Sequence, residues 1–223
     1  MQIQRLVPKI LAAATMLGAA IAARADVVTF TGWSVGPSTV QVTAPYSAHL
    51  YAGEFAVNAG GVPLTSFCID LMQSVAIGGT YNDFTRSSLD QSVTSTQLGR
   101  FNRLYENYYD ASRASAASSA AFQTAVWEII RDGNGTLNLG SGSFAMNAGS
   151  NGSVWNIASG WLADLDGKGT GEWTFERLGS PTRQDQLIAA RTTGQVPVSG
   201  TLGLVAIAGL GLAAGKRRRP QRG

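Results

Sequence analysis

The sequence predicts an α+β fold, in which a helical pair is inserted into an antiparallel β framework resembling a sandwich or a barrel. Two patterns predict this class. The first part of the body alternates apolar and polar residues between Gly and Pro breaks, which is typical of short strands. The middle of the chain carries apolar residues at helical spacing. Apolar segments near both ends add an N-terminal signal helix and a C-terminal hydrophobic helix to the expected fold.

Residues 1–25 have the pattern of a secretory signal peptide. Arg5 and Lys9 precede an apolar segment from residue 10 to 23, which is too short to span a membrane comfortably. The motif Ala23-Arg24-Ala25 is typical of a signal-peptidase site. We therefore expect export across the inner membrane, with Asp26 as the mature N-terminus.

Strands are expected in the first third of the body. Residues 27–58 are rich in Thr, Val, Tyr and Phe and predict two to four strands. A further strand is predicted from Leu64 to Leu71, and a short one around Tyr81 after a Gly-Gly turn.

Helices are expected next. Apolar residues at helical spacing predict one helix over about 95–110 and a second over about 114–131, which Gly133 ends. A short helix is predicted over 154–165, after a loop-rich segment, and a strand over 172–178.

The chain divides into four expected parts. These are a signal peptide (1–25), an extracellular domain (26–179), a polar linker (180–195) and a sorting or anchor tail (196–220). The formal charge of +3 does not describe the extracellular domain, since eight of the 17 Lys and Arg residues lie in the two terminal segments. The remaining nine face 14 Asp and Glu residues, so the mature domain is acidic and a nucleic-acid partner is not expected.

The C-terminal segment has the arrangement of a cleavable sorting signal. Val196-Pro197 precede the apolar stretch TLGLVAIAGLGLAAG and the basic cluster Lys216, Arg217, Arg218 and Arg219. The stretch is shorter than the roughly 20 residues of a stable transmembrane helix. The segment resembles the PEP-CTERM sorting domain of Gram-negative bacteria, although Val198-Ser199 replace the commonest Glu-Pro. The resemblance implies an exosortase-type membrane peptidase as a partner, and membrane anchoring through the tail before processing; a plain C-terminal membrane anchor is the alternative.

Two residues of the body raise a chemical question. Cys68 is the chain's one cysteine, and period-2 geometry places it with Asp70 on one face of its strand, opposite Phe67 and Ile69. Gln123 shares a helix face with Trp127 and is expected to be buried, so either a hydrogen-bond partner satisfies its amide or the side chain is chemically changed. A Cys thiolate that attacks a Gln side chain and expels ammonia leaves an internal thioester, and this is our leading hypothesis.

The motifs FCIDL and FQTAVWEI resemble the two signatures of bacterial Cys–Gln thioester domains. The resemblance implies that Cys68 and Gln123 form the thioester, with Asp70, Ala125 and Trp127 as supporting positions. It also implies a β-sandwich or barrel with a helical insertion. We expect covalent attachment to an amine- or hydroxyl-bearing ligand within an exopolysaccharide or biofilm matrix, and not adhesion to host tissue.

Other functions are weighed against this one. A structural matrix protein with an inert Cys68–Gln123 pair is the first alternative, and a secreted hydrolase the second. A hydrolytic triad would depend on His49, the one histidine, so an enzyme is not expected. Asp164, Asp166 and Glu172 loosely suggest a calcium loop, but Lys168 occupies a ligand position. No cofactor or metal is expected.

Overall fold

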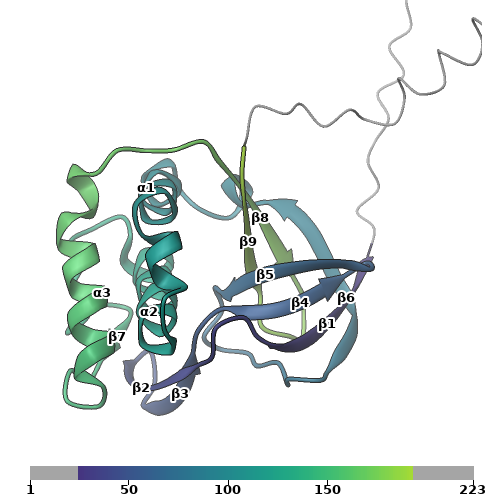
Figure 1. Ribbon diagram of the computed structural model, residues 1–223, viewed down its shortest axis with the longest axis horizontal. Coiled ribbons are helices and arrows are strands. Elements are labelled where there is room, and N and C mark those ends of the chain that lie inside the picture. The colour runs from purple at the N-terminus through teal and green to yellow at the C-terminus, as the bar shows by residue number, and fades with distance from the viewer. Residues whose placement is uncertain (1–24, 193–223) are drawn as a thin grey trace, which may run out of the picture.

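The computed structural model describes residues 25–192, and within them a closed antiparallel barrel of six strands lies beside three α-helices (Figure 1). The strands are β1 (Ala25–Trp33), β2 (Ser38–Ala44), β3 (Ala48–Ala52), β4 (Phe55–Ala59), β5 (Val62–Cys68), β6 (Thr80–Ser88), β7 (Ala145–Met146), β8 (Trp173–Gly179) and β9 (Gln186–Arg191). The helices are α1 (Ser95–Ser112), α2 (Ala116–Asp132) and α3 (Gly152–Asp164).

The barrel has the strand order β1-β4-β5-β9-β8-β6, and all neighbours are antiparallel. A separate sheet of order β3-β2-β7 packs below the helices (Figure 1). The helices α1 and α2 lie between β6 and β8 in the chain, so they are an insertion into the barrel. The predicted α+β class with an antiparallel barrel-like framework is confirmed, and the inserted segment contains α3 and β7 in addition to the predicted helical pair.

Local sequence explains where the helices begin and end. Thr94 caps α1 and Ser115 caps α2, each in a capping box with the residue three positions later. Gly133 ends α2, as the sequence predicts. The predicted short helix over 154–165 corresponds to α3, which Asn151 caps.

The expected linker over 180–195 instead contains β9. This strand pairs with β8 on one side and with β5 on the other, and so closes the barrel. Gln186, Leu187 and Ile188 are buried in it. The prediction was wrong because the segment begins and ends with polar residues, which hide a short buried strand between them.

The end of β5 also differs from its prediction. The strand stops at Cys68, so Ile69 and Asp70 lie beyond it, and Phe67 and Cys68, predicted on opposite faces, are both buried. The reason is that the helices cover this end of the strand. Phe67 packs on Phe122 of α2, with ring centroids 4.7 Å apart, while Cys68 faces two other residues of the same helix.

The terminal predictions fall outside the described residues. These are the signal peptide up to residue 24, the sorting motif Val196-Pro197, the hydrophobic tail and its basic cluster. Within residues 25–192, none of the helices has the length and apolar character needed to cross a membrane.

Candidate functional site

The fold brings Cys68 and Gln123 together. Cys68 ends β5 and Gln123 lies midway along α2, and each is only 1% exposed. The Gln123 amide spans the backbone of Cys68: its Oε1 accepts the Cys68 N–H at 2.9 Å, and its Nε2 donates to the Cys68 carbonyl at 2.8 Å. We call this pair of hydrogen bonds the amide clasp.

The amide clasp answers the question of how a buried glutamine is satisfied. Its carbonyl oxygen and its amino group each have a backbone partner, so burial of Gln123 needs no chemical change to explain it. The clasp also fixes the Gln123 side chain against the residue that carries the thiol. The same geometry therefore serves a structural role and places a carbonyl group beside Cys68.

The Cys68 sulfur has two neighbours of its own. The indole N–H of Trp127 donates to Sγ at 3.4 Å, and the thiol donates to the backbone carbonyl of Asp70 at 3.1 Å. Burial raises the pKa of the Cys68 thiol, and the contacts with Trp127 and Asp70 lower it by less. The free thiol is therefore protonated at neutral pH.

The three predicted supporting residues differ in what they contact. Trp127 contacts the pair directly, because its indole N–H donates to Cys68 Sγ. Asp70 contributes its backbone carbonyl, whereas its carboxylate accepts the Met72 N–H at 2.7 Å and holds the turn after β5. Ala125 is fully buried in the core.

A cavity of about 430 Å³ has Trp127 in its wall, and the indole N–H of Trp127 donates to Cys68 Sγ; Cys68 and Gln123 themselves are not among the residues that line it. The Tyr46 hydroxyl, also in this wall, donates to the Leu71 carbonyl at 2.5 Å, and burial raises the pKa of Tyr46, with smaller contributions from Cys68 and Asp70. The cavity has five aromatic lining residues: Trp33, Tyr46, Tyr51, Phe55 and Trp127.

Sequence reasoning missed most of this cavity. Tyr46 and Tyr51 belong to the segment predicted only as generic strands, and Gln184 belongs to the segment predicted as a linker. The one available signal was the aromatic content of residues 27–58. That signal does not say which rings would meet Trp127, about 70 residues later in the chain.

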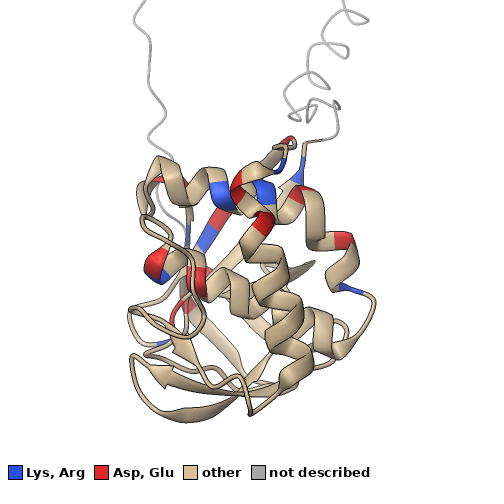
Figure 2. Ribbon diagram, turned by 90° about the vertical axis from the view of Figure 1, so that its left-hand side faces the viewer, with Lys and Arg blue, Asp and Glu red and all other residues tan. Residues whose placement is uncertain are grey.

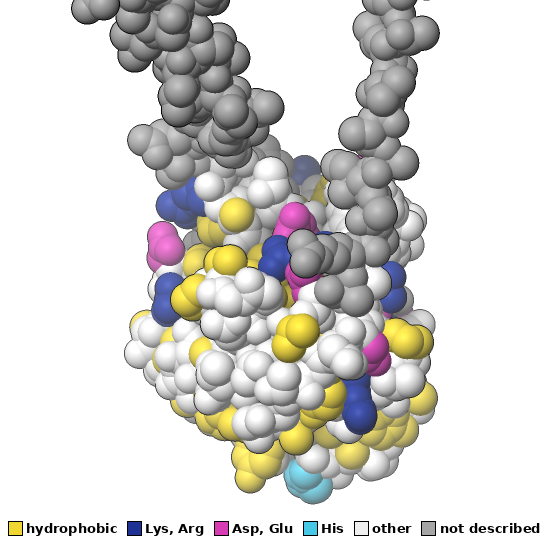
Figure 3. Space-filling view, turned by 90° about the vertical axis from the view of Figure 1, so that its right-hand side faces the viewer, with side chains coloured by type: hydrophobic (Ala, Val, Ile, Leu, Met, Phe, Trp, Pro, Cys, Tyr) yellow, Lys and Arg dark blue, Asp and Glu magenta, His cyan; other side chains and the backbone are white. Residues whose placement is uncertain are grey.

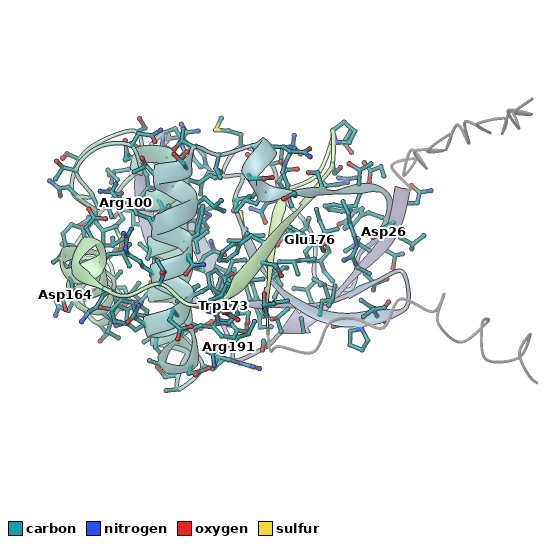
Figure 4. The ribbon with its side chains drawn as sticks, turned by 90° about the horizontal axis from the view of Figure 1, so that it is seen from above. Asp26, Arg100, Asp164, Trp173, Glu176 and Arg191 are labelled. Atoms are coloured by element: carbon teal, nitrogen blue, oxygen red, sulfur yellow. The ribbon has the colours of Figure 1, made fainter. Side chains whose placement is uncertain are left out.

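Most charged side chains lie in another part of the molecule, although Asp70 and Asp185 are near enough to Cys68 to raise the pKa of its thiol. Figure 2 shows the charged residues mainly in the upper part of the molecule, whereas the lower part, where Figure 1 places β2 and β3, is mostly uncharged. Arg100 forms an ion pair with Asp166 at 2.6 Å, and Figure 4 shows Trp173 and Arg191 side by side, with the guanidinium carbon 4.9 Å from the ring centroid.

The weaker candidates of the sequence are placed as follows. His49 is exposed on β3. In the suggested calcium loop, Asp166 is held by Arg100 and Lys168 binds Asp164 at 3.2 Å. Across the described part of the chain, no three His, Cys, Asp or Glu side chains are grouped as a metal site requires.

Comparison of the chain with protein-family models, with curated proteins and with solved structures finds no match, so the candidate site stands on its own geometry.

Proposed function

We propose that this protein is exported and sorted to the cell surface, and that Cys68 and Gln123 form an internal thioester through which it attaches covalently to a partner of the exopolysaccharide or biofilm matrix. The amide clasp is the observation that carries this proposal. It holds the Gln123 carbonyl beside Cys68, with its oxygen on a backbone N–H at 2.9 Å. Hydrogen bonding to a carbonyl oxygen favours attack at its carbon, because negative charge develops on that oxygen.

Thioester formation balances without an outside reagent. Cys68 Sγ forms a bond to the Gln123 side-chain carbonyl carbon, the bond from that carbon to Nε2 breaks, and ammonia leaves with the thiol proton. The high pKa of the buried thiol makes this step slow unless the proton passes to the leaving nitrogen as the bond forms.

The finished thioester stores a reactive carbonyl away from water. A partner amine or hydroxyl attacks the same carbon, the carbon–sulfur bond breaks, and the proton of the nucleophile goes to sulfur. The products are an amide or ester at Gln123 and a free thiol at Cys68. The protein is consumed in this reaction, so it is a covalent binder and not an enzyme.

The export and sorting part of the proposal depends on the terminal sequences alone. The segment 1–25 supports export, and the tail with Val196-Pro197 and its basic cluster supports processing by an exosortase-type peptidase.

A second function is favoured by one observation. The amide clasp gives both the carbonyl oxygen and the amino group of uncrosslinked Gln123 a hydrogen-bond partner, as a purely structural contact would. In this second function the pair is inert, the clasp fastens α2 to the end of β5, and the protein is a non-reactive component of the matrix.

Reaction with methylamine distinguishes the thioester function from the inert, structural one. The thioester account expects the purified protein to gain one methylamide at Gln123 and, at the same time, one alkylatable thiol at Cys68, both located by peptide mass mapping. Cys68→Ser is the control and should gain neither. An untreated, denatured protein in which Cys68 is already fully alkylatable and Gln123 is an ordinary amide contradicts the thioester and supports the inert clasp.

A further inference from the structure

We propose that the cavity beside Trp127 binds an uncharged sugar unit of a polysaccharide, and that a hydroxyl of this sugar is the nucleophile that opens the thioester. The first part depends only on the cavity, whereas the second rests on the proposed function. The experiment below is arranged so that the two fail separately.

The size and the rings of the cavity fit a sugar. Its volume of about 430 Å³ lies within the range of small-ligand pockets, about 300–1,000 Å³. Trp33 and Phe55 stack in its wall with ring centroids 4.3 Å apart, and Tyr51 is 69% exposed at its rim. Aromatic faces carry partial negative charge, so they attract the weakly positive C–H groups on the faces of a sugar ring.

The charge of the cavity argues against lysine. Among the described residues that line it, none carries a formal charge. An incoming ammonium would lose its hydration with no carboxylate to replace it. The aromatic faces do attract cations, but they would hold lysine in its protonated form, which is not nucleophilic. A hydroxyl group is uncharged, so it does not lose the hydration of an ion and is not held in a protonated, non-nucleophilic form.

The polar groups of the cavity suit hydroxyl partners. Gln73, Ser74 and Gln184 supply uncharged donors and acceptors. Gln73 Nε2 donates to the Pro181 carbonyl at 3.4 Å, while its Oε1 is buried and lacks a hydrogen-bond partner among residues 25–192. A rotation of this side chain toward the cavity would give that oxygen a sugar hydroxyl as its donor.

The surroundings agree with an extended, uncharged ligand. Apolar side chains are frequent along the lower edge of the face in Figure 3, the end of the molecule where Figure 1 places β2 and β3. The rim of the cavity includes Ile77, which is 47% exposed. Neighbouring units of a chain-like sugar would meet these apolar side chains (Figure 3).

The reaction with the sugar balances in the same way as the general one. The hydroxyl oxygen forms a bond to the Gln123 carbonyl carbon, the bond to Cys68 Sγ breaks, and the hydroxyl proton moves to sulfur. The product is an ester, which is cleaved by hydroxylamine more easily than an amide.

Binding is tested first, in a protein that holds no thioester. Both Cys68→Ser and wild-type protein pretreated with methylamine are titrated by calorimetry and by indole fluorescence. The probes are neutral oligosaccharides of glucose, galactose, mannose and N-acetylglucosamine, an oligomer of glucuronic acid, and Nα-acetyl-lysine amide. We expect saturable binding of at least one neutral oligosaccharide and no saturable binding of the lysine derivative.

Two rim variants assign the binding to the cavity. Tyr51→Ala and Ile77→Asp should each weaken it tenfold or more, because one removes a ring and the other introduces a charge. Met72→Ala is the matched control, since Met72 is 66% exposed and lies outside the cavity wall, and it should bind as wild type does. Failure of every neutral oligosaccharide to bind, preferential binding of lysine, or unchanged binding in Tyr51→Ala each overturns the sugar site.

The nucleophile is tested with untreated wild-type protein and the oligosaccharide that binds. An adduct at Gln123 that hydroxylamine removes, together with a newly free Cys68 thiol, is the expected result. Sugar binding without thioester formation would overturn the proposed function and the hydroxyl step but leave the cavity assignment intact. A thioester that reacts with methylamine but not with the bound sugar would overturn the hydroxyl step alone.

Discussion

At the scale of single residues, Gln123 determines how the candidate site is held. A buried amide is costly unless both of its ends are paired, and here both are paired to one residue of another element. The sequence indicated that Gln123 would be buried and offered two explanations for it. The structure contains the first, a hydrogen-bond partner, and the second depends on chemistry between the same two residues.

Removal of the amide clasp should destabilise the fold. Gln123→Ala leaves the Cys68 N–H and carbonyl without side-chain partners in a buried place, and opens a small cavity. We expect a loss of about 2–4 kcal/mol in the free energy of unfolding, measured by urea denaturation. Gln91→Ala, at an exposed position, is the control and should change stability by less than about 0.5 kcal/mol. Equal stabilities of the two variants would show that the clasp contributes nothing.

Glu128 gives the stability a pH dependence of known sign. It is fully buried, its Oε1 accepts the Asn138 N–H at 2.6 Å, and burial raises its pKa from 4.5 to about 7. The Glu128 carboxyl group therefore loses its proton at lower pH in the unfolded state than in the folded state. Its contribution to stability is therefore complete below about pH 4.5 and is lost as the pH rises to about 7.

The size of this effect should be about 3 kcal/mol, since each pKa unit corresponds to about 1.4 kcal/mol. Thermal unfolding between pH 4.5 and 8 tests it, and Glu128→Gln should flatten the decline. Glu172→Gln, at an exposed glutamate, serves as the control and should keep the wild-type slope. If Glu128→Gln keeps that slope too, Glu128 is not the titrating group.

At the scale of elements, β9 decides whether the barrel is closed. It joins β5 to β8, and it positions Gln184, two residues before its start, at the cavity. The two inserted helices were predictable because spacing, capping residues and the terminal glycine are all local signals. The role of β9 was not predictable from local signals. This short strand closes the barrel by pairing with β5, which lies more than 100 residues earlier in the chain.

Truncation tests the role of β9. A chain spanning 25–179, which matches the expected domain boundary, lacks β9 and leaves β5 and β8 with open edges. We expect it to lose cooperative unfolding and to aggregate, whereas a chain spanning 25–192 should unfold in one transition by circular dichroism. Cooperative unfolding of both at the same midpoint would mean that β9 is dispensable.

At the scale of the whole molecule, the cavity beside Trp127 is an uncharged region of a domain that carries many ion pairs. Ion pairs involve residues of α1, α3 and β8, and the cavity beside Trp127 is lined by uncharged residues. The sequence indicated that Cys68, Gln123 and Trp127 belong to one site, because two short motifs carry them. It did not indicate the cavity, since Tyr46 and Tyr51 come from the first third of the domain and Gln184 from its end, and only the folded chain brings them together.

The central claim is the bond between Cys68 and Gln123, and the intact mass of the purified, denatured protein tests it most directly. The account predicts a mass lower than that of the sequence by one ammonia, a deficit that Cys68→Ser abolishes. A full mass in the wild-type protein, with Cys68 freely alkylated, would contradict it.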